Sequence, residues 1–158
     1  MGEFAAARPT LLVVHHSHGW RTTRMAEAVV AGARKTESVE VRERHASTAA
    51  LEDLLLADGY LFGTPETFGS MCGLLKDFFE RTYYPALGRL NGRPYAVFVC
   101  AGNDGSGAVQ SIQRIARGHG LREVQPALIA RSEGVLAQVN DCEDLGAAMA
   151  LGMAMGAF

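Results

Sequence analysis

The most informative segment of the sequence is Gly63-Thr64-Pro65-Glu66-Thr67-Phe68-Gly69-Ser70. It follows the short apolar segment 59–62 and leads directly into an amphipathic helix. We therefore interpret it as a loop, with a glycine near each end, at the carboxyl end of a buried strand, where open α/β sheets bind their ligands. Plain strand-to-helix connections take about 2 to 6 residues, so a longer one favours a functional loop.

Two further loops of the same kind follow other predicted strands. One comes after the apolar segment 11–16 and the other after segment 94–101. Because the carboxyl ends of parallel strands lie at one edge of a sheet, we expect all three loops to meet. The first contains Ser17, His18, Gly19, Trp20, Arg21, Thr22 and Thr23, and the third contains Ala101, Gly102, Asn103, Asp104, Gly105, Ser106 and Gly107.

Hydrophobic periodicity predicts five strands that alternate with five helices. The strands are segments 11–16, 39–42, 59–62, 94–101 and 121–130, and the last contains Pro126, which sheets tolerate mainly at an edge. The helices are expected from about residue 22, over 47–56, over 71–82, over 108–119 and from about residue 140. Strict alternation predicts an α/β fold in three layers, with a five-stranded parallel sheet between helices on both faces.

Composition and charge narrow the class of protein. The chain has 158 residues and a net charge of -2 with scattered arginines, so we expect no nucleic-acid partner. Residues 1–8 are interpreted as a disordered tail or cloning remnant, and 9–158 as one domain. The three cysteines, Cys72, Cys100 and Cys142, have no Cys-x-x-Cys spacing, which favours reduced thiols and a cytoplasmic protein.

The apolar C-terminal segment 145–158 is too short to span a bilayer, so no membrane partner is expected. It is interpreted as a tightly packing helix. That helix either closes the core or seats a second copy of the chain as a homo-oligomer.

The three loops together favour a mononucleotide. Hydroxyls of the first loop and the amides at a helix N-terminus suit a phosphate group, even without lysine. The second loop offers a flat, partly apolar wall for a ring system, and glycines of the third allow close backbone approach. FMN combines these features. The predicted cofactor-binding residues are Ser17, His18, Gly19, Trp20, Arg21, Thr22, Thr23, Thr64, Pro65, Glu66, Thr67, Phe68, Gly69, Ala101, Gly102, Asn103, Asp104 and Gly105.

At these residues the chain resembles the flavodoxin-like family, and most closely the WrbA-type and related NAD(P)H-dependent FMN oxidoreductases. The loop 63–71 is similar to the family's Gly-Thr-Pro loop, and Ser17 and Thr22 match its Ser-x-Thr-Gly-x-Thr phosphate motif, from which Gly19 and Trp20 depart. The resemblance implies strand order 2-1-3-4-5. It also implies that NAD(P)H reduces FMN, which then reduces a small acceptor such as a quinone. The flavin carries the chemistry, so no catalytic side chain is predicted.

Several alternatives stay open at the level of sequence. Ser17 and Thr22 could act only as a helix cap. The protein could be a one-electron carrier, although carriers are often strongly acidic, or a module that binds flavin weakly because of Gly19 and Trp20. Arg21, Arg24 and Arg131 could guide an anionic nicotinamide nucleotide. His15, His16 and His18 suggest a metal site, but adjacent strand residues point to opposite faces, and no metal is predicted.

Overall fold

In the computed structural model, which describes residues 6–158, the chain forms one twisted sheet. The sheet order is β2-β1-β3-β5-β6, while β4 pairs with β3 and β7 pairs with β5. All pairings are parallel except the antiparallel contact of β4 with β3. The strands are β1 (Thr10–His15), β2 (Glu40–His45), β3 (Gly59–Thr67), β4 (Ser70–Met71), β5 (Pro94–Ala101), β6 (Arg122–Glu123) and β7 (Leu128–Arg131).

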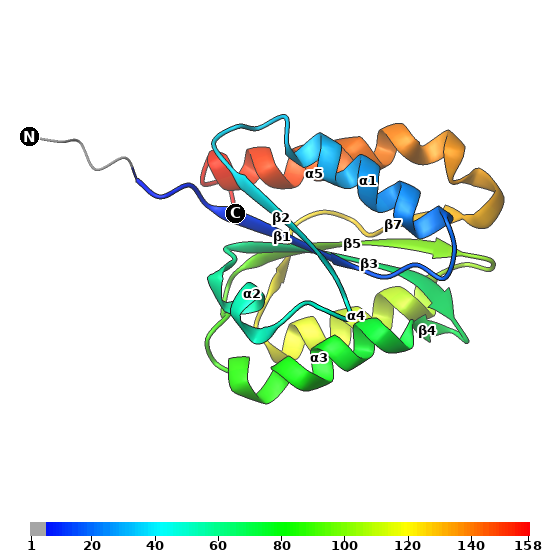
Figure 1. The fold of residues 1–158 in the computed structure, drawn as a ribbon, viewed down its shortest axis with the longest axis horizontal. Helices are drawn as coiled ribbons and strands as arrows, with labels where there is room; N and C mark the ends of the chain where they lie inside the picture. Colours follow the sequence, from blue (N-terminus) through cyan, green and yellow to red (C-terminus); the bar gives the residue numbers. More distant parts are fainter. Residues whose placement is uncertain (1–5) are drawn as a thin grey trace, which may run out of the picture.

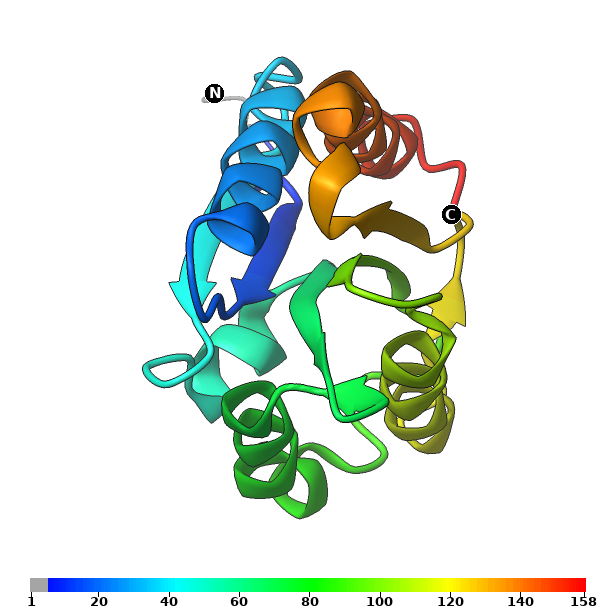
Figure 2. The same ribbon diagram turned by 90° about the vertical axis from the view of Figure 1, so that its right-hand side faces the viewer.

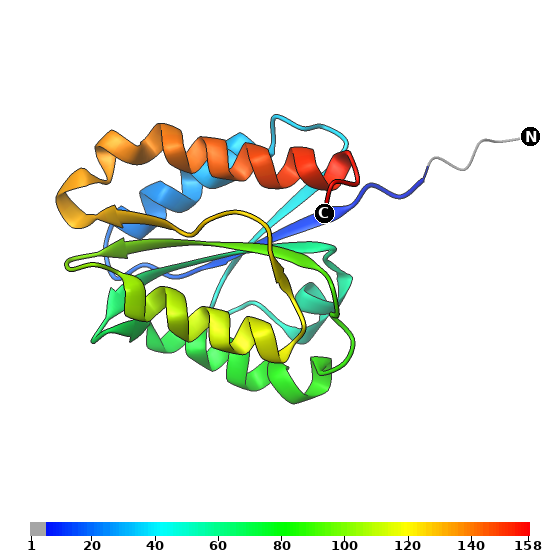
Figure 3. The same cartoon turned by 180° about the vertical axis from the view of Figure 1, so that it is seen from behind.

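Helices cover both faces of the sheet, which gives the predicted three layers (Figures 1 and 3). One face carries α1 (Arg21–Ala33) and α5 (Val139–Ala154). The other carries α2 (Leu51–Leu56), α3 (Gly73–Ala86) and α4 (Ser106–Gly118). Two short 3-10 helices, η1 (Ser132–Gly134) and η2 (Leu136–Gln138), connect β7 to α5. The predicted order 2-1-3-4-5 is confirmed, with β5 and the β6–β7 pair as its fourth and fifth strands.

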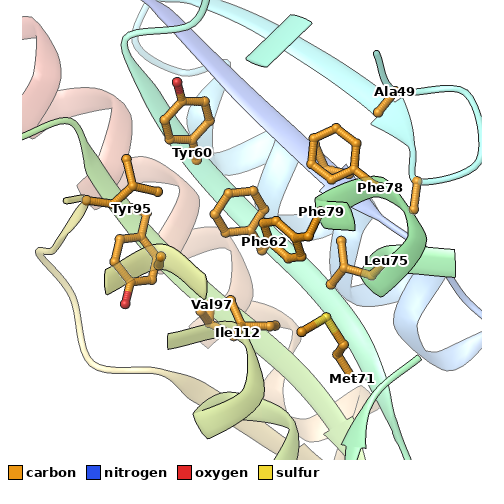
Figure 4. Packing of buried hydrophobic residues seen from close by; sticks show 14 of the residues in the cluster. Ala49, Tyr60, Phe62, Met71, Leu75, Phe78, Phe79, Tyr95, Val97 and Ile112 are labelled. Atoms are coloured by element: carbon orange, nitrogen blue, oxygen red, sulfur yellow. The ribbon is translucent and has the colours of Figure 1, made fainter. Parts of the chain in front are cut away.

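Two hydrophobic clusters, one on each side of the sheet, form the core. On the side of α2, α3 and α4, Phe62 stacks on Tyr60 with ring centroids 5.7 Å apart and meets the edge of Phe79 at 5.0 Å (Figure 4). Each fully buried side chain of this size stabilises the fold by roughly 1.5–3 kcal/mol. The four residues 11–14 of β1 are fully buried, which explains the unbroken apolar run in the sequence.

Helices α1 and α5 touch backbone to backbone. A Cβ atom built on Gly146 would lie 1.9 Å from the carbonyl oxygen of Val29, and one on Gly32 would lie 1.9 Å from that of Glu143. The glycines of the C-terminal segment thus allow close packing on α1. The structure places residues of α5 in the core, and the seating of a second copy of the chain stays a prediction.

Several element boundaries differ from the predictions, and three of the differences have a clear physical cause or a consequence for the site. The second helix begins at Leu51 and not near residue 47, because residues 46–49 form a turn in which the Ala49 amide donates to the His45 carbonyl at 2.9 Å. The predicted fifth strand is divided into β6 and β7, and Pro126, which has no amide hydrogen, lies between them. The third strand continues past Phe62 to Thr67, and this changes the candidate site.

The termini add two observations. Of the predicted tail, residues 1–5 lie outside the described part of the chain, and Arg8 donates to the carbonyl oxygen of Glu37 at 3.1 Å. Among the helices of residues 6–158, none combines the length and apolarity needed to cross a membrane.

Candidate functional site: a pocket at the carboxyl ends of the strands

The register of the sheet brings the three predicted ligand segments together. His15, the last residue of β1, is paired with Gly63 of β3, and Pro65 of β3 is paired with Cys100 of β5. The chain segments that follow these residues meet at one edge of the sheet, which faces the viewer in Figure 2. They surround a cavity of about 180 Å³, lined by Ser17, His18, Gly19, Trp20, Arg21, Thr22, Pro65, Glu66, Cys100, Gly102 and Ser132.

The first segment leads into an uncapped helix. No side chain caps the N-terminus of α1, and the Ser17 hydroxyl donates instead to the carbonyl oxygen of Gly19 within the loop. The helix-cap interpretation of Ser17 is therefore wrong. An uncapped N-terminus leaves the first-turn amides of α1 free to bind an anion, and Thr22 adds a hydroxyl from the first turn.

Trp20 lies directly before α1 and is 52 % exposed. The Arg21 guanidinium lies 5.2 Å from the centre of the indole ring, and its Nε donates to the carbonyl oxygen of Ser132 at 3.0 Å. The large side chain thus forms part of the cavity wall and does not fill the turn. Gly19 has open space around the place of its missing Cβ, so the loop stays accessible.

The second segment is a β-hairpin and not the predicted loop. Strand β3 runs on to Thr67, Phe68 and Gly69 form the turn with φ of 50° and 72°, and β4 returns antiparallel. Gly63 lies within the strand, where the Phe98 ring occupies the space of a Cβ, so Gly63 serves packing and is not a hinge. The segment is consequently held more firmly than a loop would be.

The predicted ligand residues of the hairpin lie in three different environments: the cavity lining, the core and the solvent. Pro65 and Glu66 line the cavity. Thr64 is fully buried and structural, because its hydroxyl accepts the Cys72 amide at 2.9 Å before α3. Phe68 is fully exposed at the tip. Glu66 also reaches the start of α4, where its carboxylate accepts the Ala108 amide at 3.4 Å.

The third segment contributes fewer residues to the cavity lining than predicted. Gly102 lines the cavity, whereas Asn103 and Asp104 are exposed to solvent outside it. The Asp104 carboxylate accepts the amide and the hydroxyl of Ser106, both at 2.9 Å, and these bonds lower the pKa of Asp104. Asp104 thus fixes the start of α4, and Gly105, with φ of 76°, provides the left-handed residue before it.

Half of the predicted set stands outside the cavity lining. These residues are Thr23, Thr64, Thr67, Phe68, Gly69, Ala101, Asn103, Asp104 and Gly105.

Two lining residues were absent from the prediction. Cys100 is the second-last residue of the buried strand β5, and burial raises the pKa of its thiol, so a neutral thiol lines the cavity. Its position beside a ligand loop is visible in the sequence, although its type alone suggests only a small buried hydrophobe. Ser132 reaches the cavity because β7 pairs with β5, and it donates to the Ala101 carbonyl at 3.3 Å. No local sequence signal indicates this.

The histidines at the ends of β1 and β2 lie beside the first segment. His15 is paired with the Glu43 carboxylate at 2.8 Å, whereas His16 turns to His45, also at 2.8 Å. Within residues 6–158, no group of three or more His, Cys, Asp or Glu side chains has a geometry that could hold a metal ion.

Comparison with known proteins identifies the class. The fold is flavodoxin-like: a flavodoxin, WrbA-like protein from Agrobacterium tumefaciens superimposes with a TM-score of 0.76 at 24% identity, over 93% of this chain and 98% of the other. The family described as NADPH-dependent FMN reductase matches residues 21–134, and the chain belongs to that family.

Two curated relatives are more similar in sequence. A flavodoxin from Aquifex aeolicus is 35% identical over 97 residues, which is 61% of this chain and 52% of the relative. An NAD(P)H dehydrogenase (quinone) from Acidithiobacillus ferrooxidans is 36% identical over 110 residues, or 56% of this chain and 55% of the relative. The chain thus spans about half the length of these two relatives.

Proposed function

We propose that the protein binds FMN in the cavity at the strand ends and uses it to pass electrons from NAD(P)H to a small acceptor such as a quinone. Membership of the NADPH-dependent FMN reductase family supports the cofactor and the donor. The quinone-reducing relative supports the acceptor class. The observation that carries the proposal is the meeting of an uncapped helix N-terminus with the Pro65–Glu66 wall and Gly102 around one cavity.

The residues of the cavity fit FMN. Amides of the first turn of α1, with the hydroxyls of Ser17 and Thr22, would hold the phosphate group. Pro65, Trp20 and the backbone at Gly102 would bound the ring, and a glycine there lets the main chain approach closely. Flavin supplies the hydride and electron chemistry when bound. The protein binds and orients the ring, shields one side of it from water and leaves the other open to substrates.

The arginines beside the cavity would serve the anionic donor. Arg21 lines the cavity, while Arg24 lies 3.9 Å from the Glu27 carboxylate and Arg131 is exposed at the end of β7. Arg21 is therefore the best placed of the three to meet a nicotinamide nucleotide.

We also propose a cytoplasmic location, supported by the three cysteines, which are free buried thiols.

An anaerobic titration tests this function. Protein reconstituted with FMN is mixed with NADPH or NADH, and the flavin absorbance is followed. We expect either donor to bleach the bound flavin faster than it bleaches free FMN at the same concentration. Addition of a quinone under the same conditions should restore the oxidised spectrum.

The relative described as a flavodoxin favours a second candidate, a carrier that exchanges electrons with protein partners. A carrier would bind FMN equally well but leave it oxidised with both nicotinamide nucleotides, while dithionite would reduce it. That outcome would contradict the enzyme assignment and retain the flavin site.

A further inference from the structure

Four of the five histidines gather beside the first segment of the cavity. His16 Nδ1 lies 2.8 Å from His45 Nε2, and His45 Nδ1 lies 2.7 Å from the Ser47 hydroxyl. On its other side, the His16 ring meets the edge of His18 with centroids 5.0 Å apart, and His18 lines the cavity. We call His45, His16 and His18 the histidine chain. It runs from the end of β2 to the cavity.

No acidic side chain contacts the histidine chain in the described residues. From β1, His15 faces it, and the Glu43 carboxylate of β2 is bound to His15. From α2, Asp53 is bound to Arg44 at 3.2 Å. The hairpin places the Thr67 hydroxyl 3.4 Å from His18, and its Glu66 carboxylate lines the same cavity but accepts the Ala108 amide of α4 at 3.4 Å. From α1, Arg21 is directed to Ser132.

These surroundings disfavour the protonated form of His16. Burial lowers the pKa of His16, and the charges of His45, His18 and His15 lower it further. The 2.8 Å bond between His16 and His45 needs one N–H and one lone pair, so the two rings can share a single added proton, but they cannot both be fully protonated in this arrangement.

The first segment lacks lysine and offers a phosphate group mainly amides and hydroxyls. We propose that the histidine chain takes up a proton from solvent when a phosphate group occupies this segment, and so adds positive charge to that of Arg21, whose Nε is directed to the Ser132 carbonyl oxygen. The inference rests on the proposed binding of FMN. Its physical basis is that an opposite charge within about 4–6 Å raises the pKa of a histidine. His18 and His16 connect the cavity to His45. His45 therefore acts through its bond to His16 and does not contact the phosphate group.

The consequence is a pH dependence that FMN shows and riboflavin does not. The phosphate of FMN becomes more anionic as pH rises through about 6, which by itself would strengthen binding. Loss of the shared proton acts in the opposite direction. We expect FMN affinity to fall by about tenfold more than riboflavin affinity between about pH 6 and about pH 8, in the range where histidine titrates.

Fluorescence-quenching titrations with FMN and with riboflavin, in buffers free of phosphate and sulfate, measure this difference. Calorimetry of FMN binding in two buffers of different ionisation enthalpy counts the protons taken up. His45 is exposed, so His45→Gln should fold normally. The variant should take up fewer protons on binding FMN. The difference in pH dependence between FMN affinity and riboflavin affinity should also become smaller. His119→Gln, which removes the one histidine outside the group, is the matched control and should leave both unchanged.

The outcomes separate the two proposals. FMN binding without proton uptake, or with equal uptake in the wild type and His45→Gln, overturns the role of the histidine chain and leaves the flavin site intact. Failure of both flavins to bind at every pH overturns the flavin site itself.

Discussion

Thr22 is the most deeply buried hydroxyl of the first segment, at 2 % exposure, and it lines the cavity. We expect Thr22→Ala to weaken FMN binding by about tenfold or more, because a hydrogen bond to a charged group contributes about 1.5–3 kcal/mol. Riboflavin, which lacks the phosphate group, should bind almost as before. Fluorescence titration with both flavins measures the two effects.

Thr22→Ser is the matched control, because it keeps the hydroxyl and removes only a methyl group. It should bind FMN much more tightly than Thr22→Ala does. Equal losses of FMN affinity in the two variants, or an unchanged FMN affinity in Thr22→Ala, would contradict a phosphate contact at this residue.

His119 is buried at 1 % exposure, and neither of its ring nitrogens has a hydrogen-bond partner in the described residues. Burial lowers its pKa below the ordinary value of 6.5, so below that pH the unfolded chain binds more protons than the folded one. The stability associated with His119 is thus complete above about pH 6.5 and is lost as pH falls.

His119→Phe keeps a ring against Tyr83, whose centroid lies 4.6 Å from that of His119. We expect it to raise the free energy of unfolding by about 1 kcal/mol at neutral pH, because an unpaired buried polar group is removed. The gain should grow as pH falls. Urea denaturation at pH 7.5 and pH 5.5 measures both. A gain that shrinks on acidification would contradict the assigned pKa shift.

At the scale of elements, the hairpin β3–β4 positions Pro65 and Glu66, which line the cavity. Its tip rests on the first turn of α4, where a Cβ on Gly107 would lie 2.0 Å from the Gly69 carbonyl oxygen. The Ser111 hydroxyl accepts the Met71 amide at 3.0 Å and binds the returning strand. We therefore expect Gly107→Ala to displace the hairpin and, with it, Pro65 and Glu66.

Gly107→Ala should weaken riboflavin as well as FMN by several-fold, since overpacking costs about 1–3 kcal/mol. This distinguishes it from Thr22→Ala, which affects FMN alone. Gly134→Ala, at a glycine of η1 with open space around it, is the control and should bind both flavins normally. Normal riboflavin binding by Gly107→Ala would show that the hairpin position does not set the ring site.

The contact between α1 and α5 gives a prediction about stability. Gly146→Ala would place a Cβ 1.9 Å from the Val29 carbonyl oxygen and separate the two helices. We expect a loss of about 2–3 kcal/mol in the free energy of unfolding, despite the better helix propensity of alanine. Gly73→Ala, in the first turn of α3 with nothing nearby, should be neutral. Urea denaturation of both variants measures this, and a neutral Gly146→Ala would contradict the close packing.

The hairpin also shows where prediction from the sequence ends. The buried half of β3 was predictable from its apolar run, but its continuation through Pro65 to Thr67 was not, because a polar, proline-containing stretch after a glycine is typical of a loop. Its turn contains Phe68 and Gly69, and the usual Asn-Gly signal is absent. Thr64 and Asp104 were predicted as ligands because position alone cannot distinguish a hydroxyl or carboxylate that binds a ligand from one that binds a neighbouring amide.

At the scale of the whole molecule, more of the structure could be predicted from the sequence than at the hairpin. Alternating strands and helices, with fully apolar strands, fix a parallel sheet covered on both faces, and strand order follows from the handedness of its crossovers and the family resemblance. The meeting of the three segments follows from that order. The contribution of Ser132 to the cavity does not follow from the strand order. It depends on the pairing of β7 with β5, after the strand is interrupted at Pro126.

We propose that the cavity at the strand ends is the FMN site. A crystal structure of the protein with FMN is the decisive test. We expect the phosphate group at the first turn of α1, within hydrogen-bonding distance of Thr22, and the flavin ring between Trp20, Pro65 and Gly102. A flavin bound elsewhere, or a phosphate group remote from α1, would contradict it.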